Sequence, residues 1–156
     1  MKQPESLEMV AQFHNTFKHP VLNTPTIPDS KRCELRVSLI AEELDELSDA
    51  IKDKDMVEIA DALCDIQYVL SGAILEFGLG DKFNTLFSEV QRSNMSKACT
   101  SEEEAKATVE YFLKEKGEEC YYKQEGDLFL VYRKSDNKTM KSINYSPADL
   151  KGIIEG

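Results

Sequence analysis

Positive charge is scarce in this sequence. Its 156 residues include 19 Lys and Arg against 29 Asp and Glu, and the formal net charge is -10. Proteins bind nucleic acids and anionic membranes through basic surfaces, so we expect neither kind of partner. A phosphorylated small molecule is compatible with this charge, because metal ions and a few local cations can meet its phosphates.

Zinc-binding and secretion patterns are missing as well. The four cysteines form no C-x-x-C pair and no histidine lies near them, which argues against a zinc site. The first ten residues lack the long apolar core of a signal peptide. The sequence therefore predicts a cytoplasmic protein with reduced thiols, in which Cys64 packs as a small hydrophobe.

No long apolar run is free of polar groups. The longest apolar-rich segment, residues 59–79, contains Asp61, Asp65, Gln67 and Glu76. These side chains would be costly in lipid, so we expect a helix buried between helices or at a dimer interface. The segment has no Lys or Arg, so a bound cation is the simplest partner for carboxylates buried there.

Apolar spacing predicts that the first part of the chain is helical. Four helices are expected, over residues 5–18, 30–53, 55–77 and 81–95. The short loops that join the last three are typical of an antiparallel bundle. Residues 1–97 are therefore predicted to be a helical core.

Residues 98–156 are predicted to be a small mixed appendage. Its expected elements are a helix over 101–116, strands over 119–124, 127–133 and 139–143, and a last helix over 146–154. Ser101 and Glu104 have the spacing of a capping box, and Ser146 followed by Pro147 is typical of a helix start. The predicted fold class is thus mainly α, an antiparallel bundle with a C-terminal α+β appendage.

Two groups of acidic residues stand on the second and third expected helices. The first reads Glu42-Glu43-x-x-Glu46 and the second reads Glu58-x-x-Asp61. Residues three and four apart lie on one helical face. Glu46 and Asp61 lie at similar distances on either side of the turn near residue 54. At about 1.5 Å of rise per residue, they share a level in an antiparallel pair.

Carboxylates that converge in this way repel one another unless a cation joins them. Mg²⁺ or Mn²⁺ prefers oxygen ligands and can hold substrate phosphates. Glu42 is the extra acid beside the pair and is our candidate for the general base. Asp65 has three candidate roles, as a further metal ligand, as a hydrogen-bond partner of a metal ligand, or as a polar group hydrogen-bonded within the protein. We favour the second. For the first group alone, a solvated helix face is the alternative.

A second constellation, residues 91–97, follows the fourth expected helix. Arg92 and Lys97 can meet phosphate oxygens, and Asn94 can hydrogen-bond a sugar or a phosphate. The alternative is a helix end with favourable cations on its last turn.

These motifs resemble the MazG-like all-α nucleoside triphosphate pyrophosphohydrolases, in a branch related to phosphoribosyl-ATP pyrophosphohydrolase. The similar stretches are residues 39–47, 58–69, 89–97 and 138–150. Residues 98–135 look like an insertion without an assigned role. The resemblance implies a homodimer or a dimer of dimers.

The resemblance also implies roles for site residues. The Mg²⁺ ligands would be Glu43, Glu46, Glu58 and Asp61. Glu42 would position or deprotonate the attacking water, and Asn94 and Lys97 would contact the nucleotide.

We therefore predict Mg²⁺-dependent hydrolysis of a nucleoside triphosphate to a monophosphate and pyrophosphate, with a deoxypyrimidine triphosphate as leading substrate. The alternatives are phosphoribosyl-ATP, a modified nucleotide, or a helical dimer that binds nucleotide without turnover. A di-iron bundle is disfavoured, because neither histidine lies three residues after a Glu.

Overall fold

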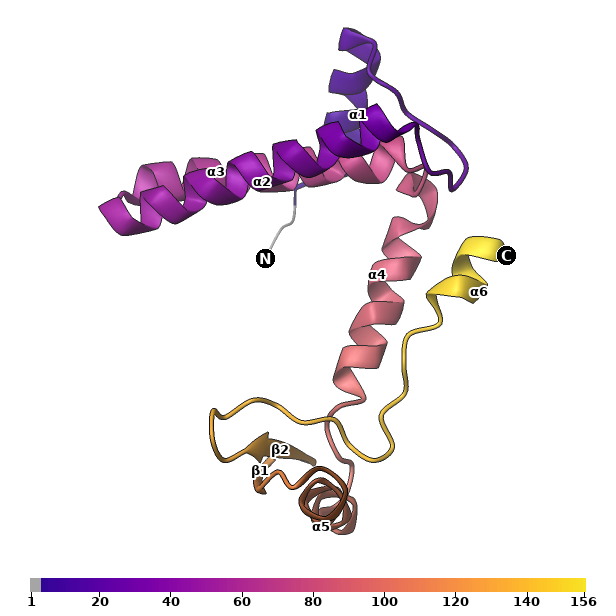
Figure 1. Ribbon diagram of the computed structural model, residues 1–156. Helices are drawn as coiled ribbons and strands as arrows, with labels where there is room; N and C mark the ends of the chain where they lie inside the picture. Colours follow the sequence, from indigo (N-terminus) through magenta and orange to yellow (C-terminus); the bar gives the residue numbers. More distant parts are fainter. Residues whose placement is uncertain (1–3) are drawn as a thin grey trace. The chain divides into compact units, whose positions relative to one another are not determined.

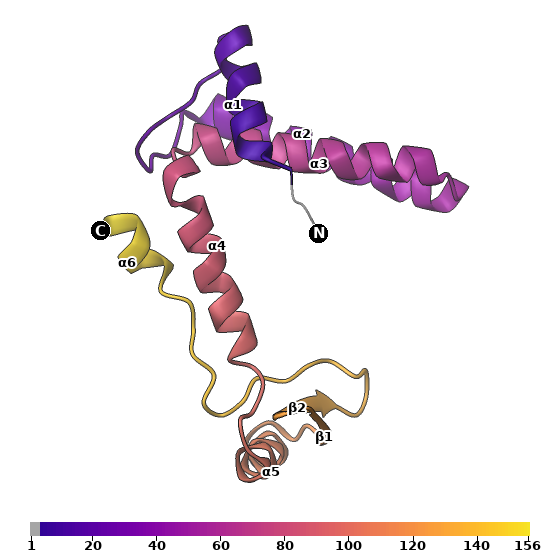
Figure 2. The ribbon, with the colours of Figure 1, turned by 180° about the vertical axis from the view of Figure 1, so that it is seen from behind.

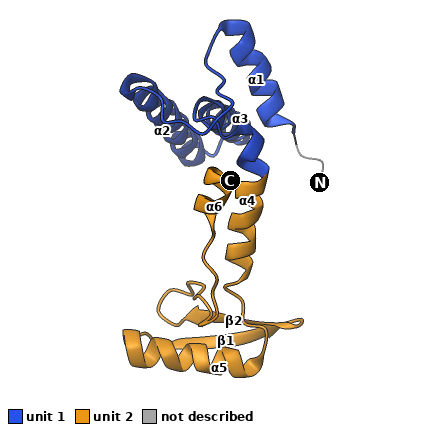
Figure 3. Cartoon of the chain, turned by 90° about the vertical axis from the view of Figure 1, so that its right-hand side faces the viewer, with its two compact units in different colours: residues 1–84 blue, residues 85–156 orange. Residues whose placement is uncertain are grey.

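The computed structural model describes residues 4–156 and divides into two compact units, the first ending at Asn84 and the second spanning Thr85–Gly156 (Figure 3). The chain is 61% helical, with a small two-stranded sheet near its C-terminal end. The predicted fold class, mainly α with a small appendage, is confirmed. Helix α4, Gly80–Met95, crosses the boundary between the units, and the domain border predicted after residue 97 stays a prediction.

The first unit is built on a helical hairpin. Helices α2, Ser30–Asp53, and α3, Met56–Glu76, run antiparallel along each other, and α1, Ser6–Phe17, packs on α3 (Figures 1 and 2). The turn between α2 and α3 is short because Lys54 adopts a left-handed conformation, with φ 58°, and Asp55 caps α3. The Asp55 Oδ1 accepts from the backbone N–H of Val57 at 2.9 Å. Such a cap satisfies a donor that the first turn leaves unpaired.

A buried carboxylate joins the two long helices. Glu76 is 0% exposed and accepts hydrogen bonds from the guanidinium groups of Arg32 and Arg36 on α2. Burial alone would raise the pKa of Glu76, but the two arginines outweigh it and hold that pKa below the ordinary value. The predicted cation concerned the acidic group that contains Glu58 and Asp61, whereas the charge of Glu76 is met by two arginines of the neighbouring helix.

The loop before α2 lies against the end of α3. Leu22 N–H donates to Leu75 O and Thr26 N–H donates to Phe77 O, each at 3.0 Å. Gly78 has φ +66°, and a Cβ at this position would lie 1.9 Å from the Thr24 carbonyl oxygen. Both the conformation and the close approach therefore require glycine at residue 78.

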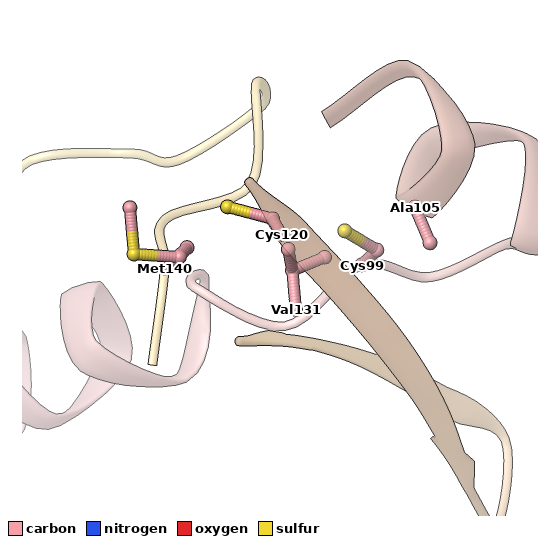
Figure 4. Packing of buried hydrophobic residues seen from close by; sticks show 5 residues of the cluster. All are labelled: Cys99, Ala105, Cys120, Val131 and Met140. Carbon is pink, nitrogen blue, oxygen red and sulfur yellow. The ribbon is translucent and has the colours of Figure 1, made fainter. Parts of the chain in front are cut away.

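The second unit packs a helix on a β-hairpin (Figure 3). Helix α5, Glu102–Tyr111, continues into the π-helical turn η1, Phe112–Lys116, and covers strands β1, Cys120–Glu125, and β2, Leu128–Arg133. The strands are antiparallel. The core between them contains Cys99, Ala105, Cys120, Val131 and Met140 (Figure 4).

Three expectations need correction, two about the C-terminal tail and one about Cys64 on α3. Instead of a strand at 139–143 there is a single bridge between Thr139 and Tyr132. Helix α6, Leu150–Glu155, begins later than predicted and is capped by Asp149, because the Ser146 hydroxyl accepts a hydrogen bond from Arg92. Cys64 is exposed rather than packed.

Within residues 4–156, no single helix is long and apolar enough to cross a membrane, although the bent pair of α3 and α4 meets that test by length and composition.

Candidate functional site

Acidic side chains from α2 and α3 line an open pocket between these helices, but Glu42, Glu43 and Asp65 are not among its lining residues. The pocket has a volume of about 440 Å³, and its lining includes Glu46, Glu58 and Asp61. Glu46 from α2 and Asp61 from α3 thus lie at one level, as the length of the two helices on either side of the turn predicts. Sequence reasoning missed three further acids that line the pocket, Asp49, Asp53 and Asp55, although their helical spacing from Glu46 and Glu58 was a visible signal.

Glu43 is the most perturbed of these acids. It is half-buried, and its Oε2 is buried without a hydrogen-bond partner. Burial raises the pKa of Glu43, and the negative charges of Asp65, Glu46, Glu42 and Asp61 raise it further. A buried carboxylate oxygen without a donor is costly, so this position favours a positive ligand.

Protein cations do not neutralise this group. Among residues 4–156, no Lys, Arg or His comes within ion-pair distance of any of the six predicted acids, which are Glu42, Glu43, Glu46, Glu58, Asp61 and Asp65. The oxygen donors are those that a hard divalent cation prefers. The residues therefore fit Mg²⁺, although in this arrangement no three Asp, Glu, His or Cys of the described chain gather closely enough to hold an ion.

The acids are less buried than the sequence suggested. Glu58 and Asp61 are exposed, and Asp65 is half-buried. The expectation that the apolar segment buries Glu58 and Asp61 is wrong for this chain, because large apolar neighbours are exposed themselves. Val57 is 75% exposed and Leu63 is 52% exposed.

The second predicted group, Arg92, Asn94 and Lys97, belongs to the second unit. The Arg92 guanidinium forms a two-point ion pair with Glu89, at 2.7 and 2.8 Å, and donates to Ser146 Oγ and Pro147 O, each at 3.0 Å. The hydrogen bond from Arg92 and a second one from a backbone N–H lower the pKa of Glu89 to about 2. The Arg92 guanidinium thus donates four hydrogen bonds to other residues of the same chain.

Asn94 and Lys97 lie together at the end of α4. Lys97 Nζ donates to Asn94 Oδ1 at 2.8 Å. Their contact with a nucleotide stays a prediction. The structure also places Lys141 and Tyr145 near this group, two residues to which the sequence assigned no role. Lys141 Nζ lies 4.2 Å from the centroid of the Tyr145 ring.

The first unit is an all-helical unit with carboxylates on both helices of an antiparallel hairpin, and comparison with known families specifies its class. The family model for phosphoribosyl-ATP pyrophosphohydrolase matches residues 10–94. The chain belongs to this family, which is part of the MazG-like all-α nucleoside triphosphate pyrophosphohydrolase superfamily. The matched residues contain both acid groups and end at Asn94.

The chain is also similar to an uncharacterized protein of Acanthamoeba polyphaga mimivirus. The two are 37% identical over 76 residues, which cover 46% of this chain and 30% of the viral protein. The chain therefore spans less than a third of the length of this relative.

Proposed function

We propose that this chain hydrolyses a nucleotide between its α and β phosphates, with Mg²⁺ as cofactor, and releases pyrophosphate. Membership of the family supports a pyrophosphohydrolase activity on nucleotides. The observation that carries the metal-dependent part is the buried Glu43 Oε2, which lacks a hydrogen-bond partner. Mn²⁺ is expected to substitute, because it accepts the same oxygen ligands.

The proposed mechanism gives each acid of the hairpin a role. Glu43, Glu46, Glu58 and Asp61 would hold the metal ion. Mg²⁺ supplies positive charge that neutralises and polarises phosphate oxygens when it is bound. Asp65, whose charge acts on Glu43, would orient one of the metal-binding side chains rather than bind the ion itself.

Glu42 is the proposed general base. It would orient a water molecule and take its proton as the water oxygen forms a bond to the α-phosphorus. The bond from the α-phosphorus to the bridging oxygen then breaks, and pyrophosphate leaves with that oxygen. A nucleoside monophosphate is the other product.

The substrate is proposed to be a nucleoside triphosphate, with a deoxypyrimidine triphosphate as the leading candidate. Phosphoribosyl-ATP and modified nucleotides share the same reacting bond and form the alternatives. Asn94 and Lys97 are proposed to contact the nucleotide, as the family resemblance implies. Arg92 is proposed to contact it as well, because a guanidinium group can meet phosphate oxygens.

A homodimer or a dimer of dimers is the proposed working form. Monomeric proteins rarely expose large apolar patches, yet the hairpin leaves several large apolar side chains exposed. They include Val37 at 70%, Leu44 at 58%, Val57 at 75% and Leu63 at 52%. Analytical ultracentrifugation of the full chain tests this proposal, and a monomer at micromolar concentration would contradict it.

The activity is tested with a nucleotide panel assayed for pyrophosphate in the presence of Mg²⁺. The wild type is compared with Glu43→Gln and Asp61→Asn, and the matched controls are Glu115→Gln and Asp127→Asn, which change exposed acids outside the pocket. We expect pyrophosphate release by the wild type and both controls and its loss in the two site variants. Nucleotide binding without turnover would leave only the non-catalytic alternative, and orthophosphate as the first product would show that a different bond is cleaved.

A further inference from the structure

The C-terminal tail, residues 138–150, is fastened to the end of α4. Ser142 N–H donates to the Lys97 carbonyl oxygen at 3.1 Å. Ser146 N–H donates to Ser96 Oγ at 3.0 Å, and the Arg92 guanidinium reaches Ser146 as described above. The tail therefore runs beside the segment that contains Asn94 and Lys97.

The inserted segment, residues 98–135, holds the same tail from the other direction. Met140 N–H donates to Val131 O at 2.8 Å, and Met140 is buried in the core of the second unit. Thr108 Oγ1 accepts from Ile143 N–H at 3.2 Å, and the Glu104 carboxylate accepts from the Ser142 hydroxyl. The residues on both sides of Lys141 are thus fixed by the insertion.

These contacts bring two ammonium groups to one phenol. Tyr145 Oη lies 2.9 Å from the hydroxyl of Ser93, which is buried, and Lys141 lies over the Tyr145 ring. The hydrogen bond between the Ser93 and Tyr145 hydroxyls and the positive charges of Lys141 and Lys97 lower the pKa of Tyr145. Both lysines are therefore close enough to act on the same hydroxyl.

Neither lysine is neutralised within the part of the chain that the structure describes. No Asp or Glu of residues 4–156 lies within ion-pair distance of Lys97 or Lys141. Two like charges near one group repel each other unless an anion lies between them. Asn94 adds N–H donors, because its Oδ1 already accepts from Lys97.

We propose that Lys141 and Tyr145 complete, with Lys97 and Asn94, a binding site for a phosphate group, and that the inserted residues 98–135 position the tail that supplies the first two. The ligand is a phosphate group of the nucleotide or of released pyrophosphate, an assignment that rests on the proposed function. The ammonium groups supply charge, and the Tyr145 hydroxyl and the Asn94 amide supply directed donors.

The site is tested by isothermal titration calorimetry, in which the full chain is titrated with inorganic pyrophosphate in the presence of EDTA. Without a divalent cation the acids of the hairpin repel the anion, so the measured affinity reports on the lysines. We expect Lys141→Ala to weaken binding at least roughly tenfold, the lower end of the range for hydrogen bonds to charged groups. Tyr145→Phe should weaken it by about threefold, within the range of an ordinary hydrogen bond.

The matched control is Lys123→Ala. Lys123 also lies over a tyrosine of the second unit, at 5.8 Å from the centroid of the Tyr121 ring, and its removal changes the net charge by the same amount. We expect wild-type affinity for this variant. Equal losses in Lys123→Ala and Lys141→Ala, or wild-type affinity in Lys141→Ala, would overturn the site.

The positioning role is tested at Thr108 with a pair of substitutions. Thr108→Val removes the hydroxyl that accepts from Ile143 N–H, whereas Thr108→Ser keeps it. We expect weaker pyrophosphate binding in the first variant and near wild-type binding in the second. Equal affinities in the two variants would refute positioning through this contact.

The two proposals fail separately. Pyrophosphate binding that depends on Lys141, in a protein that turns over no nucleotide, would refute the proposed function and retain the phosphate site. Turnover with Mg²⁺ together with unchanged pyrophosphate affinity in Lys141→Ala would retain the function and refute the site.

Discussion

Two carboxylates on one helical hairpin differ sharply in how their charge is met. Glu76, at the end of α3, is fully buried and is held by Arg32 and Arg36. Glu43, in the middle of α2, has a buried oxygen that no described residue contacts through a hydrogen bond. The pKa of Glu76 is lowered and the pKa of Glu43 is raised. The first therefore stabilises the fold of the free protein, whereas the second is costly until a cation arrives.

The largest expected effect is on stability at Glu76. Glu76→Gln leaves two arginines without a negative partner, and breaking a buried ion pair in this way costs about 3 kcal/mol. Urea unfolding followed by circular dichroism measures the loss. A variant that unfolds at the wild-type urea concentration would contradict the structural role of this pair.

Glu43 provides the contrasting test, because loss of its charge should not lower the free energy of unfolding as loss of the Glu76 charge does. In EDTA, Glu43→Gln removes repulsion from neighbouring acids, so its unfolding free energy should equal or exceed that of the wild type. In Mg²⁺, the same variant should lose at least about two orders of magnitude in pyrophosphate release, the loss of several kcal/mol of charge stabilisation. If Glu43→Gln is clearly less stable than the wild type in EDTA, the unmet charge of Glu43 does not destabilise the free protein and the contrast with Glu76 is wrong.

Adding Mg²⁺ should stabilise the wild type selectively. A ligand at 100 times its Kd stabilises the folded state by about 2.7 kcal/mol. Thermal unfolding with Mg²⁺ against EDTA should therefore show an increase in Tm for the wild type and for Glu115→Gln, and none for Glu43→Gln. An equal increase in all three proteins would place the ion elsewhere.

Lowering the pH should remove the contribution of Glu76. Because its folded-state pKa lies below the ordinary value of 4.5, the stabilisation is fully present above about pH 4.5 and is lost as the pH falls through the folded-state pKa. Glu76→Gln has no carboxyl to protonate at this position. The stability difference between the two proteins, measured by urea unfolding, should thus be wide at pH 7 and should shrink as the pH falls from 4.5 to the folded-state pKa of Glu76. A constant difference would rule out this linkage.

The smallest effect is expected at Asp49. This residue lines the same pocket as Glu46 and Asp61, but it pairs with Lys52 at 2.8 Å and both side chains are exposed. Exposed ion pairs contribute less than about 1 kcal/mol. Asp49→Asn should leave the pyrophosphate-release rate within about twofold of the wild type, and a large loss would add Asp49 to the metal site.

The register of the hairpin could be predicted from sequence because its signals are local. Apolar spacing, the Asp55 cap and the equal distances of Glu46 and Asp61 from the turn all lie within a short stretch of chain. The partners of Glu76 could not be predicted, because Arg32 and Arg36 precede it by 44 and 40 residues. Spacing along one helix does not indicate which residue of a neighbouring helix will face it.

The tail was mispredicted for the same reason. Residues 139–143 begin with Thr139 and end with Ile143, which are both β-branched, but Met140 packs in the core and Ser142 bonds to Glu104, so no regular strand forms. The start of α6 is delayed because Arg92 and Ser96 engage Ser146. Sequence reasoning for Arg92 had considered a phosphate ligand or a favourable cation at the helix end. Two of its partners, Ser146 and Pro147, lie more than fifty residues further along the chain.

The solvent exposure of Cys64 offers a practical handle. It lies three residues after Asp61 on α3, whereas Cys99 and Cys120 are buried. A maleimide fluorophore should therefore attach at Cys64 well before it reaches the two buried thiols. With Cys33 replaced by serine, such a dye would report divalent-ion occupancy in real time, without coupling the signal to turnover.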